Sequence, residues 1–255
     1  MDGELAALVR RHDPDRFLTA LFAPPEKRDA LLTLYAFNHE LARAREVVSE
    51  PPLALIRLQW WREVVEGEDR RHDVAVPLRA AIRAGLLTLD DLLAMIDARE
   101  AEVAPFETLP DWRNYLLGSA GGVAVAAGRA LGAPEPERLR PLGAAFGVAG
   151  VLRSIAVHSR QGRCMLPEDV LAAHGVVPEA VIADPSVVAT QPLMQVLAHE
   201  GLMLLQHMRL PRLCIAAALP AVLARRDLRR APKFPVERGL GDRLAVTLAG
   251  LAGRV

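Results

Sequence analysis

Apolar residues recur at intervals of three and four along most of the chain, which is the spacing of one face of an α-helix. In the clearest instance, Pro25 and Glu26 precede a run in which Leu31, Leu34 and Leu41 follow this spacing. Proline is tolerated in the first turn of a helix because its missing N–H would have no partner there. We therefore predict a helix from Pro25 to about residue 48.

A second helix is predicted directly afterwards, from the proline pair at residues 51–52 to Gly67. It should pack on the preceding helix through one apolar stripe. The two adjacent tryptophans, Trp60 and Trp61, point about 100° apart on such a helix, so we expect one in the core and the other in a groove or on the surface. The predicted stripe consists of Leu55, Leu58, Trp61 and Val65.

The same periodicity predicts helices along the rest of the chain, while the alternating pattern of β-strands is absent. The breaks between these segments are short and resemble loops between helices rather than linkers between domains. We predict a single all-α domain over residues 1–255. The further predicted helices span residues 77–84, 88–103, 111–131, 137–158, 186–210, 211–226 and 236–251.

Composition is compatible with one large core, since 51% of the 255 residues are hydrophobic and 24% are charged. Basic and acidic residues number 31 each, so no strong positive field indicates nucleic-acid binding. Cys164 and Cys214 lie far apart in the sequence without metal-ligand spacing, which indicates buried thiols in a reducing compartment.

The first residues lack the basic segment and apolar run of a signal peptide, so we expect a cytoplasmic protein. The longest stretch without charge or histidine, residues 114–128, is shorter than the ~20 apolar residues of a membrane span and contains four glycines. We predict no transmembrane segment. Peripheral contact with the inner membrane stays open.

Two adjacent acids, Asp90 and Asp91, resemble a carboxylate pair, but Thr88 stands three residues before Asp91. A threonine followed at this distance by an acid is typical of a helix start. We therefore interpret these acids as structural.

The segment Tyr35–Glu46, with sequence YAFNHELARARE, resembles the first signature of the squalene/phytoene synthase family. In that family an aromatic segment precedes paired aspartates that bind Mg²⁺ and diphosphate. The resemblance places the aspartate positions at Ala42 and Arg43, and the last acidic position at Glu46.

A second segment, residues 147–167, resembles the second signature of the same family, in which two aspartates stand four residues apart. Those positions hold Ser154 and His158. The residues that keep the frame of the signature are Leu152, Arg153, Gly162, Arg163, Leu166 and Pro167.

These replacements bear on metal binding, because residues i and i+4 of a helix share a face and two aspartates there could hold one Mg²⁺ ion. Serine and neutral imidazole are poor ligands for Mg²⁺, which prefers charged oxygens. We expect no metal or other cofactor and no ordinary prenyl-condensing activity. The alternative is a divergent Mg²⁺-dependent prenyl-diphosphate transferase, in which Glu46 and other acids hold Mg²⁺ in a new arrangement.

The resemblance covers most of the chain, and its departures are similar to one non-catalytic branch of the family that acts in the assembly of mitochondrial complex I. It implies an isoprenoid-synthase-like helical bundle with a central cavity. The implied partner is a complex I subunit or assembly intermediate, and the cavity could hold a prenyl or lipid-like chain. The candidate ligand- or partner-binding residues are Tyr35, Phe37, Asn38, Glu40, Arg45, Tyr115, Arg153 and Arg163.

Several arginines in the two signature segments could meet an anionic head group or an acidic partner helix, since a guanidinium group forms bidentate contacts. Ion pairing within the chain, as between Glu40 and Arg43, is equally consistent with their spacing. These arginines are Arg43, Arg45, Arg153, Arg160 and Arg163.

Overall fold

The computed structural model describes residues 3–48, 50–189, 192–205, 211–231 and 238–255. Within these ranges the chain forms helices and no β-strand, so the predicted all-α class is confirmed. The α-helices are α1 (Gly3–His12), α2 (Pro14–Ala20), α3 (Pro25–Glu46), α4 (Pro51–Glu66), α5 (Ala75–Arg83), α6 (Leu89–Glu100), α7 (Leu109–Gly118), α8 (Ala120–Ala130), α9 (Arg140–Arg153), α10 (Ile155–Arg160), α11 (Glu168–Ala173), α12 (Pro178–Ala183), α13 (Ser186–Ala189), α14 (Pro192–Met203), α15 (Ile215–Ala218), α16 (Pro220–Arg230) and α17 (Leu240–Ala252). Short 3₁₀ segments are η1 (Ala101–Val103), η2 (Pro136–Leu139) and η3 (Arg212–Cys214).

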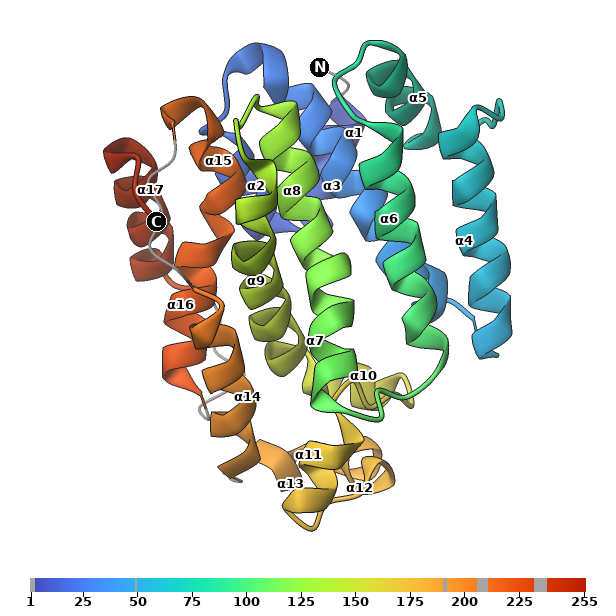
Figure 1. The fold of residues 1–255 in the computed structure, drawn as a ribbon, viewed down its shortest axis with the longest axis vertical. Helices are drawn as coiled ribbons and strands as arrows, with labels where there is room; N and C mark the ends of the chain where they lie inside the picture. Colours follow the sequence, from blue (N-terminus) through green and yellow to red (C-terminus); the bar gives the residue numbers. More distant parts are fainter. Residues whose placement is uncertain (1–2, 49, 190–191, 206–210, 232–237) are drawn as a thin grey trace.

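The long helices run roughly along the long axis of the molecule, and the short helices α10 to α13 gather at one end (Figure 1). Helix α4 lies at one edge of this view and α17 at the opposite edge. One buried apolar cluster lies mainly among α3, α4, α5, α6 and α8, and a second among α7, α9, α11 and α14. Helices α8 and α9 pack against each other between these clusters.

Helices α3 and α4 begin at the predicted prolines and pack on each other. Trp61 is 2% exposed, and its ring centroid lies 5.4 Å from that of Phe37. Trp60 is half-buried and lines a surface groove, as expected for one of two adjacent tryptophans. The prediction for Leu55 is wrong: it is 39% exposed, and the buried stripe passes instead through Ala54, one position away on the helix.

The predicted helix over residues 111–131 is divided into α7 and α8 at Ser119. The Ser119 hydroxyl donates a hydrogen bond to the carbonyl oxygen of Tyr115 at 2.7 Å, a side-chain bond that bends helices. The predicted helix over residues 137–158 is likewise divided at Ser154, between α9 and α10. Apolar spacing continues across both breaks, so periodicity alone does not reveal them.

The C-terminal predictions are confirmed in part. The described residues of the segment 186–210 form α13 and α14, and the segment 211–226 forms η3, α15 and the first part of α16. Pro220 opens α16 at a position where no donor is lost. Residues 190–191, 206–210 and 236–237 of the predicted helices lie outside the described residues.

The close packing of α8 on α9 depends on Gly143. A Cβ atom at this position would lie 2.5 Å from the carbonyl oxygen of Ala120 and 2.6 Å from the Cβ atom of Ala124. Gly150, in the same helix, has nothing within 4 Å of such an atom. Gly143 therefore allows the backbones of α8 and α9 to approach closely. At position 150 there is room for a side chain, so packing does not require glycine there.

We expect Gly143→Ala to lower the free energy of unfolding by about 1–3 kcal/mol, because the added methyl group overpacks the interface. Gly150→Ala should raise it by roughly 0.5–1 kcal/mol, because alanine has the higher helix propensity and meets open space. Urea unfolding of both variants checks the pair. Equal changes in the free energy of unfolding of the two variants would contradict the close approach of α8 and α9 at Gly143.

Other expectations from the sequence have direct structural counterparts. Both cysteines are free thiols, with Cys214 1% exposed and Cys164 half-buried.

The Thr88 hydroxyl donates to Asp91 at 2.6 Å just before α6, and Asp91 also pairs with Arg129 on α8 at 2.7 Å. These contacts agree with the structural role that the sequence predicts for Asp91. Every helix in the described part of the chain is too short or too polar to cross a bilayer.

Candidate functional site

A cavity of about 320 Å³ lies among α2, α3, α7, α9 and α10, with residues from the end of α6 and from η1 completing its wall. This size is within the range of small-molecule sites in proteins. Its wall combines charged groups with the apolar side chains of Leu116, Phe146, Val151 and Met165. The cavity therefore suits a ligand that has both a polar and an apolar part.

The positions of the first signature reach this cavity from α3. Asn38, Ala42 and Glu46 all line it, because residues four apart lie on one face of a helix. The structure places Arg43 outside the cavity wall, where its Nη1 atom lies 3.2 Å from Oε1 of Glu40 and its side chain is 42% exposed. An adjacent residue points about 100° away, so Ala42 and Arg43 do not face the same space.

The positions of the second signature reach the same cavity from the α9–α10 junction. Ser154 and His158 both line it, although the helix is interrupted at Ser154. The backbone N–H of His158 donates to the carbonyl oxygen of Ser154 at 2.9 Å, which keeps the local spacing of a helical turn. The two signature segments, more than 100 residues apart in the chain, thus meet across one cavity.

The other candidate residues divide into two groups. Asn38, Tyr115 and Arg163 line the cavity. The remaining ones lie elsewhere. Tyr35 and Phe37 are buried in the core, and Glu40 pairs with Arg43. Arg45 donates through Nη1 to the carbonyl oxygen of Val48 at 3.2 Å, and Arg153 belongs to an ion-pair cluster described below. Burial raises the pKa of Tyr35 to about 12 despite the nearby Arg16, so its hydroxyl stays protonated.

A buried polar network that sequence reasoning missed forms one side of the cavity. Glu102 is its centre: Oε1 accepts from Nη1 of Arg99 at 2.6 Å and from the Tyr115 hydroxyl at 2.7 Å, and Oε2 accepts from Nη2 of Arg163 at 2.8 Å. Arg99 also donates through Nη2 to Oδ1 of Asn38 at 3.2 Å. The Arg99, Glu102 and Arg163 side chains are only 12%, 4% and 7% exposed.

Arg99 and Glu102 look unremarkable in the sequence, because charged residues three apart near a helix end are ordinarily solvated. Only the turn of η1 brings Glu102 inward, toward Arg163 at a separation of 61 residues. Burial alone would raise the pKa of Glu102, but the guanidinium groups of Arg99 and Arg163 and the donated hydrogen bonds hold it below the ordinary value. Glu102 is therefore an ion-paired carboxylate.

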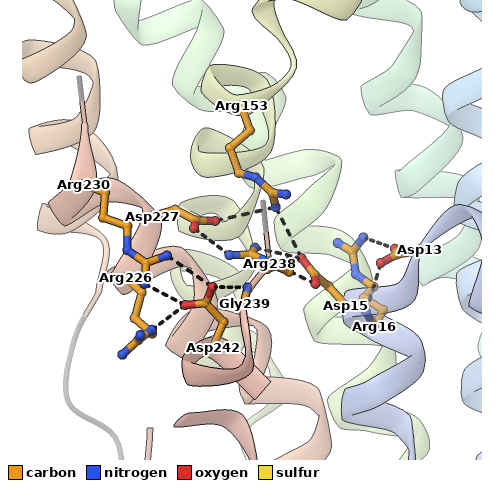
Figure 2. Close-up of polar contacts among 10 residues, drawn as sticks. All are labelled: Asp13, Asp15, Arg16, Arg153, Arg226, Asp227, Arg230, Arg238, Gly239 and Asp242. Atoms are coloured by element: carbon orange, nitrogen blue, oxygen red, sulfur yellow. Dashed lines mark hydrogen bonds and ion pairs between the residues drawn. The ribbon is translucent and has the colours of Figure 1, made fainter. Parts of the chain in front are cut away.

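Arg153 belongs to a cluster of charged side chains beside the cavity (Figure 2). Its Nη1 atom lies 3.4 Å from Oδ2 of Asp15 and 3.7 Å from Oδ2 of Asp227. Arg238 bridges the same two acids, with Nη2 at 2.8 Å from Asp15 and Nη1 at 2.6 Å from Asp227. Arg153 therefore joins α9 to α2 and α16, and its charge is neutralised within the chain.

The cavity residues do not fit the Mg²⁺ site that the catalytic alternative requires. The described residues contain no group of three His, Cys, Asp or Glu side chains placed to hold a metal ion. Both oxygens of Glu102 already accept from arginines or tyrosine. Glu46 is the one carboxylate at the signature positions in the cavity, and burial raises its pKa. Mg²⁺ prefers several charged oxygens, which this donor set does not offer.

His158 is a neutral imidazole in the cavity wall. Burial first, and the nearby Arg163 second, lower its pKa to about 4. Its Nδ1 atom is buried and has no hydrogen-bond partner among the residues that the structure describes. This nitrogen is a candidate contact for a polar group of a ligand.

The low pKa of His158 predicts a specific pH dependence. In the unfolded state His158 has its ordinary pKa near 6.5, so the unfolded state binds a proton at a higher pH than the folded state does. The stabilising contribution of neutral His158 is therefore fully present above pH 6.5 and is lost as the pH falls toward 4. Between pH 7 and 5 we expect the free energy of unfolding to fall by about 1–2 kcal/mol more in the unsubstituted protein than in His158→Gln. Urea unfolding at both pH values measures the difference. Parallel behaviour of the two proteins would show that His158 is not buried in its neutral form.

The family model for squalene/phytoene synthase matches residues 9–247, and the chain belongs to this family. "NADH dehydrogenase (ubiquinone) complex I, assembly factor 6" of Mus musculus is 29% identical over 226 residues, which cover 85% of this chain and 68% of that protein. The protein of the same name in Homo sapiens is 29% identical over 178 residues, covering 66% of this chain and 54% of its own length. This chain thus matches about half of the human relative.

A presqualene diphosphate synthase of Sinorhizobium fredii is 27% identical over 190 residues, covering 68% of this chain and 66% of that enzyme. Among solved structures, a dehydrosqualene synthase in complex with ligand aligns with a TM-score of 0.68 at 16% identity, over 98% of this chain and 94% of that one. The squalene synthase HpnC from Alicyclobacillus acidocaldarius aligns at 0.63 and 18% identity, over 98% and 93%. These likenesses confirm the isoprenoid-synthase-like fold, and the relatives confirm the resemblance drawn from the two signatures.

Proposed function

We propose that this protein acts in the assembly of respiratory complex I as a binding protein and does not ionise allylic diphosphates. The observation that carries the proposal is the cavity at which both signature segments meet, because three of its four signature positions hold Ala42, Ser154 and His158. Similarity to complex I assembly factor 6 over 85% of the chain supports the biological role.

The electrostatics of the cavity support a role without metal-assisted chemistry. Ionising an allylic diphosphate needs cations held at the leaving group, usually by carboxylates. Here Asp13 is paired with Arg16 at 2.8 Å, and Glu102 is paired with Arg99 and Arg163. Glu46 alone could not supply the several oxygen ligands that Mg²⁺ takes.

Within this proposal, the cavity binds a prenyl or lipid-like molecule with a polar end, and a surface of the protein contacts a complex I subunit or assembly intermediate. The apolar side chains of Leu116, Phe146 and Met165 suit the chain of such a ligand, and the unpartnered Nδ1 atom of His158 suits its polar end. The three arginines that line the wall, Arg16, Arg99 and Arg163, are each ion-paired, which favours a weakly charged ligand over a diphosphate.

The catalytic alternative is tested by incubating the purified protein with farnesyl or geranylgeranyl diphosphate and Mg²⁺ and measuring diphosphate release. We expect release no faster than in buffer, with an active family member assayed in parallel as the positive control. Substantial turnover would overturn the non-catalytic proposal. In that case Glu46→Gln should abolish it, as the alternative assigns Glu46 to the metal.

The assembly role is tested by deleting the gene in its source organism and measuring assembled complex I. We expect complex I to fall and to recover when the gene is restored. An unchanged level would reject the assembly role. If an apolar ligand nevertheless co-purifies with the protein, that result would instead indicate a lipid or isoprenoid carrier.

A further inference from the structure

One face of α17 carries a ridge of exposed leucines, which we call the leucine ridge. Its members, Leu240, Leu244, Leu248 and Leu251, are 79%, 60%, 65% and 66% exposed. Their spacing of four, four and three residues puts them on one side of the helix. A continuous apolar stripe of this kind on an outer surface indicates an interaction site.

The opposite face of α17 is firmly docked on the body of the protein. Asp242 accepts from Nε of Arg226 at 2.7 Å, pairs with Arg230 at 3.0 Å and accepts from the backbone N–H of Gly239 at 3.2 Å (Figure 2). Val246 is fully buried. Because these contacts use the inner face of the helix and the four leucines are exposed, the leucine ridge lies on the outer face of α17. Helix α17 itself lies at the edge of the molecule (Figure 1).

The surroundings of the leucine ridge are positively charged, although the whole chain is neutral. Residues 220–255 include eight Lys and Arg but three Asp and Glu. Arg243 and Arg254 are exposed and have no carboxylate partner among the described residues. The described acids of this segment, Asp227 and Asp242, are buried in ion pairs.

The adjoining helix α16 carries two further arginines. Arg225 and Arg229 likewise lack carboxylate partners in the described part of the chain. Residues 225 and 229 are one turn apart on α16, so their side chains lie on the same face of that helix. Burial first, and the neighbouring Arg229 second, lower the pKa of Arg225. An anionic surface would relieve their repulsion.

We propose that the leucine ridge docks on an anionic lipid bilayer, with the leucines at the boundary of the acyl chains and the arginines at the phosphate head groups. Leucines beside basic residues are the combination that binds the interface of such membranes. A protein partner fits less well, because hot spots of protein interfaces are rich in aromatic side chains seated in pockets. The exposed ridge is aliphatic and stands on a single helix at the edge of the fold.

The test is flotation of the full chain with vesicles of phosphatidylcholine alone or mixed with phosphatidylglycerol. We expect binding to the mixed vesicles, little binding to phosphatidylcholine, and release as salt rises from about 0.1 M to about 0.5 M. The double variant Leu244→Glu with Leu248→Glu should reduce the bound fraction by about tenfold or more, since it removes half of the apolar ridge. Arg243→Glu with Arg254→Glu should weaken binding to the mixed vesicles.

The matched control is Ile56→Glu, because Ile56 is 66% exposed but lies on α4 at the opposite edge of the molecule (Figure 1). It should bind vesicles like the unsubstituted protein, and circular dichroism should show all variants folded. Absence of binding to the mixed vesicles, or equal binding by the leucine variant, would overturn the proposal. The proposal would also be overturned if sedimentation showed that the unsubstituted protein is a dimer, and the leucine variant was a monomer that still bound vesicles normally.

Discussion

Glu102→Gln is expected to lower the free energy of unfolding by about 3–5 kcal/mol, because it leaves two buried guanidinium groups facing a neutral amide. Arg99 and Arg163 each lie within 3 Å of a Glu102 oxygen, at 2.6 and 2.8 Å, and neither side chain is more than 12% exposed. Urea unfolding at pH 7 measures the effect. Glu107→Gln is the matched control, since Glu107 is exposed five residues away.

The same variant should alter the acid stability of the protein. Because the folded-state pKa of Glu102 lies below its ordinary value of 4.5, its stabilising contribution is present above that value and is lost as pH falls through the folded pKa. Glu102→Gln should lack this component of acid destabilisation. A loss smaller than about 1 kcal/mol at pH 7 would mean that the network behaves like a surface ion pair.

Filling the cavity by Gly150→Leu is expected to reduce assembled complex I to the level of the deletion strain, about tenfold or more below normal, if ligands occupy the space as proposed. Gly150 lines the cavity, and a side chain there meets nothing within 4 Å of its Cβ atom. The leucine should therefore occupy the cavity without distorting α9.

Gly150→Ala is the matched control, since it changes the same backbone position but leaves most of the cavity open. Thermal unfolding should show both variants folded. Normal complex I with a folded Gly150→Leu protein would contradict a role for the cavity. The assembly function would then rest on an outer surface of the protein.

Replacement of the signature aspartates has a clear physical consequence for this cavity. In the metal-dependent family members that the signatures resemble, carboxylates bring cations to the diphosphate. Here Arg99 and Arg163 are permanent cations that share the carboxylate of Glu102. The cavity wall as a whole holds three arginines, Arg16, Arg99 and Arg163, against three acids, Asp13, Glu46 and Glu102. Such a cavity is already balanced when it is empty, so it would gain little by binding a multiply charged ligand.

The sequence by itself determined the helical class, most helix starts and the family, because these depend on local spacing. Prolines placed the starts of α3 and α4. The i to i+4 spacing of Asn38, Ala42 and Glu46 puts them on one face of α3, and all three line the cavity. Features that depend on residues within one or two helical turns of each other can be predicted from the sequence alone.

The tertiary structure alone decided which charges are buried and which leucines are exposed. Arg99, Glu102 and Arg163 meet only because η1 turns Glu102 inward toward the segment that follows α10, and no local spacing relates residues 61 apart. The periodicity of α17 predicted a helix, but a leucine stripe in a sequence ordinarily indicates the core-facing side. In the fold, Asp242 binds the other face of α17 to α16 through two arginines, so the leucines are turned outward. The reason is physical: a buried carboxylate must have its cationic partners, and satisfying it fixed the orientation of the helix.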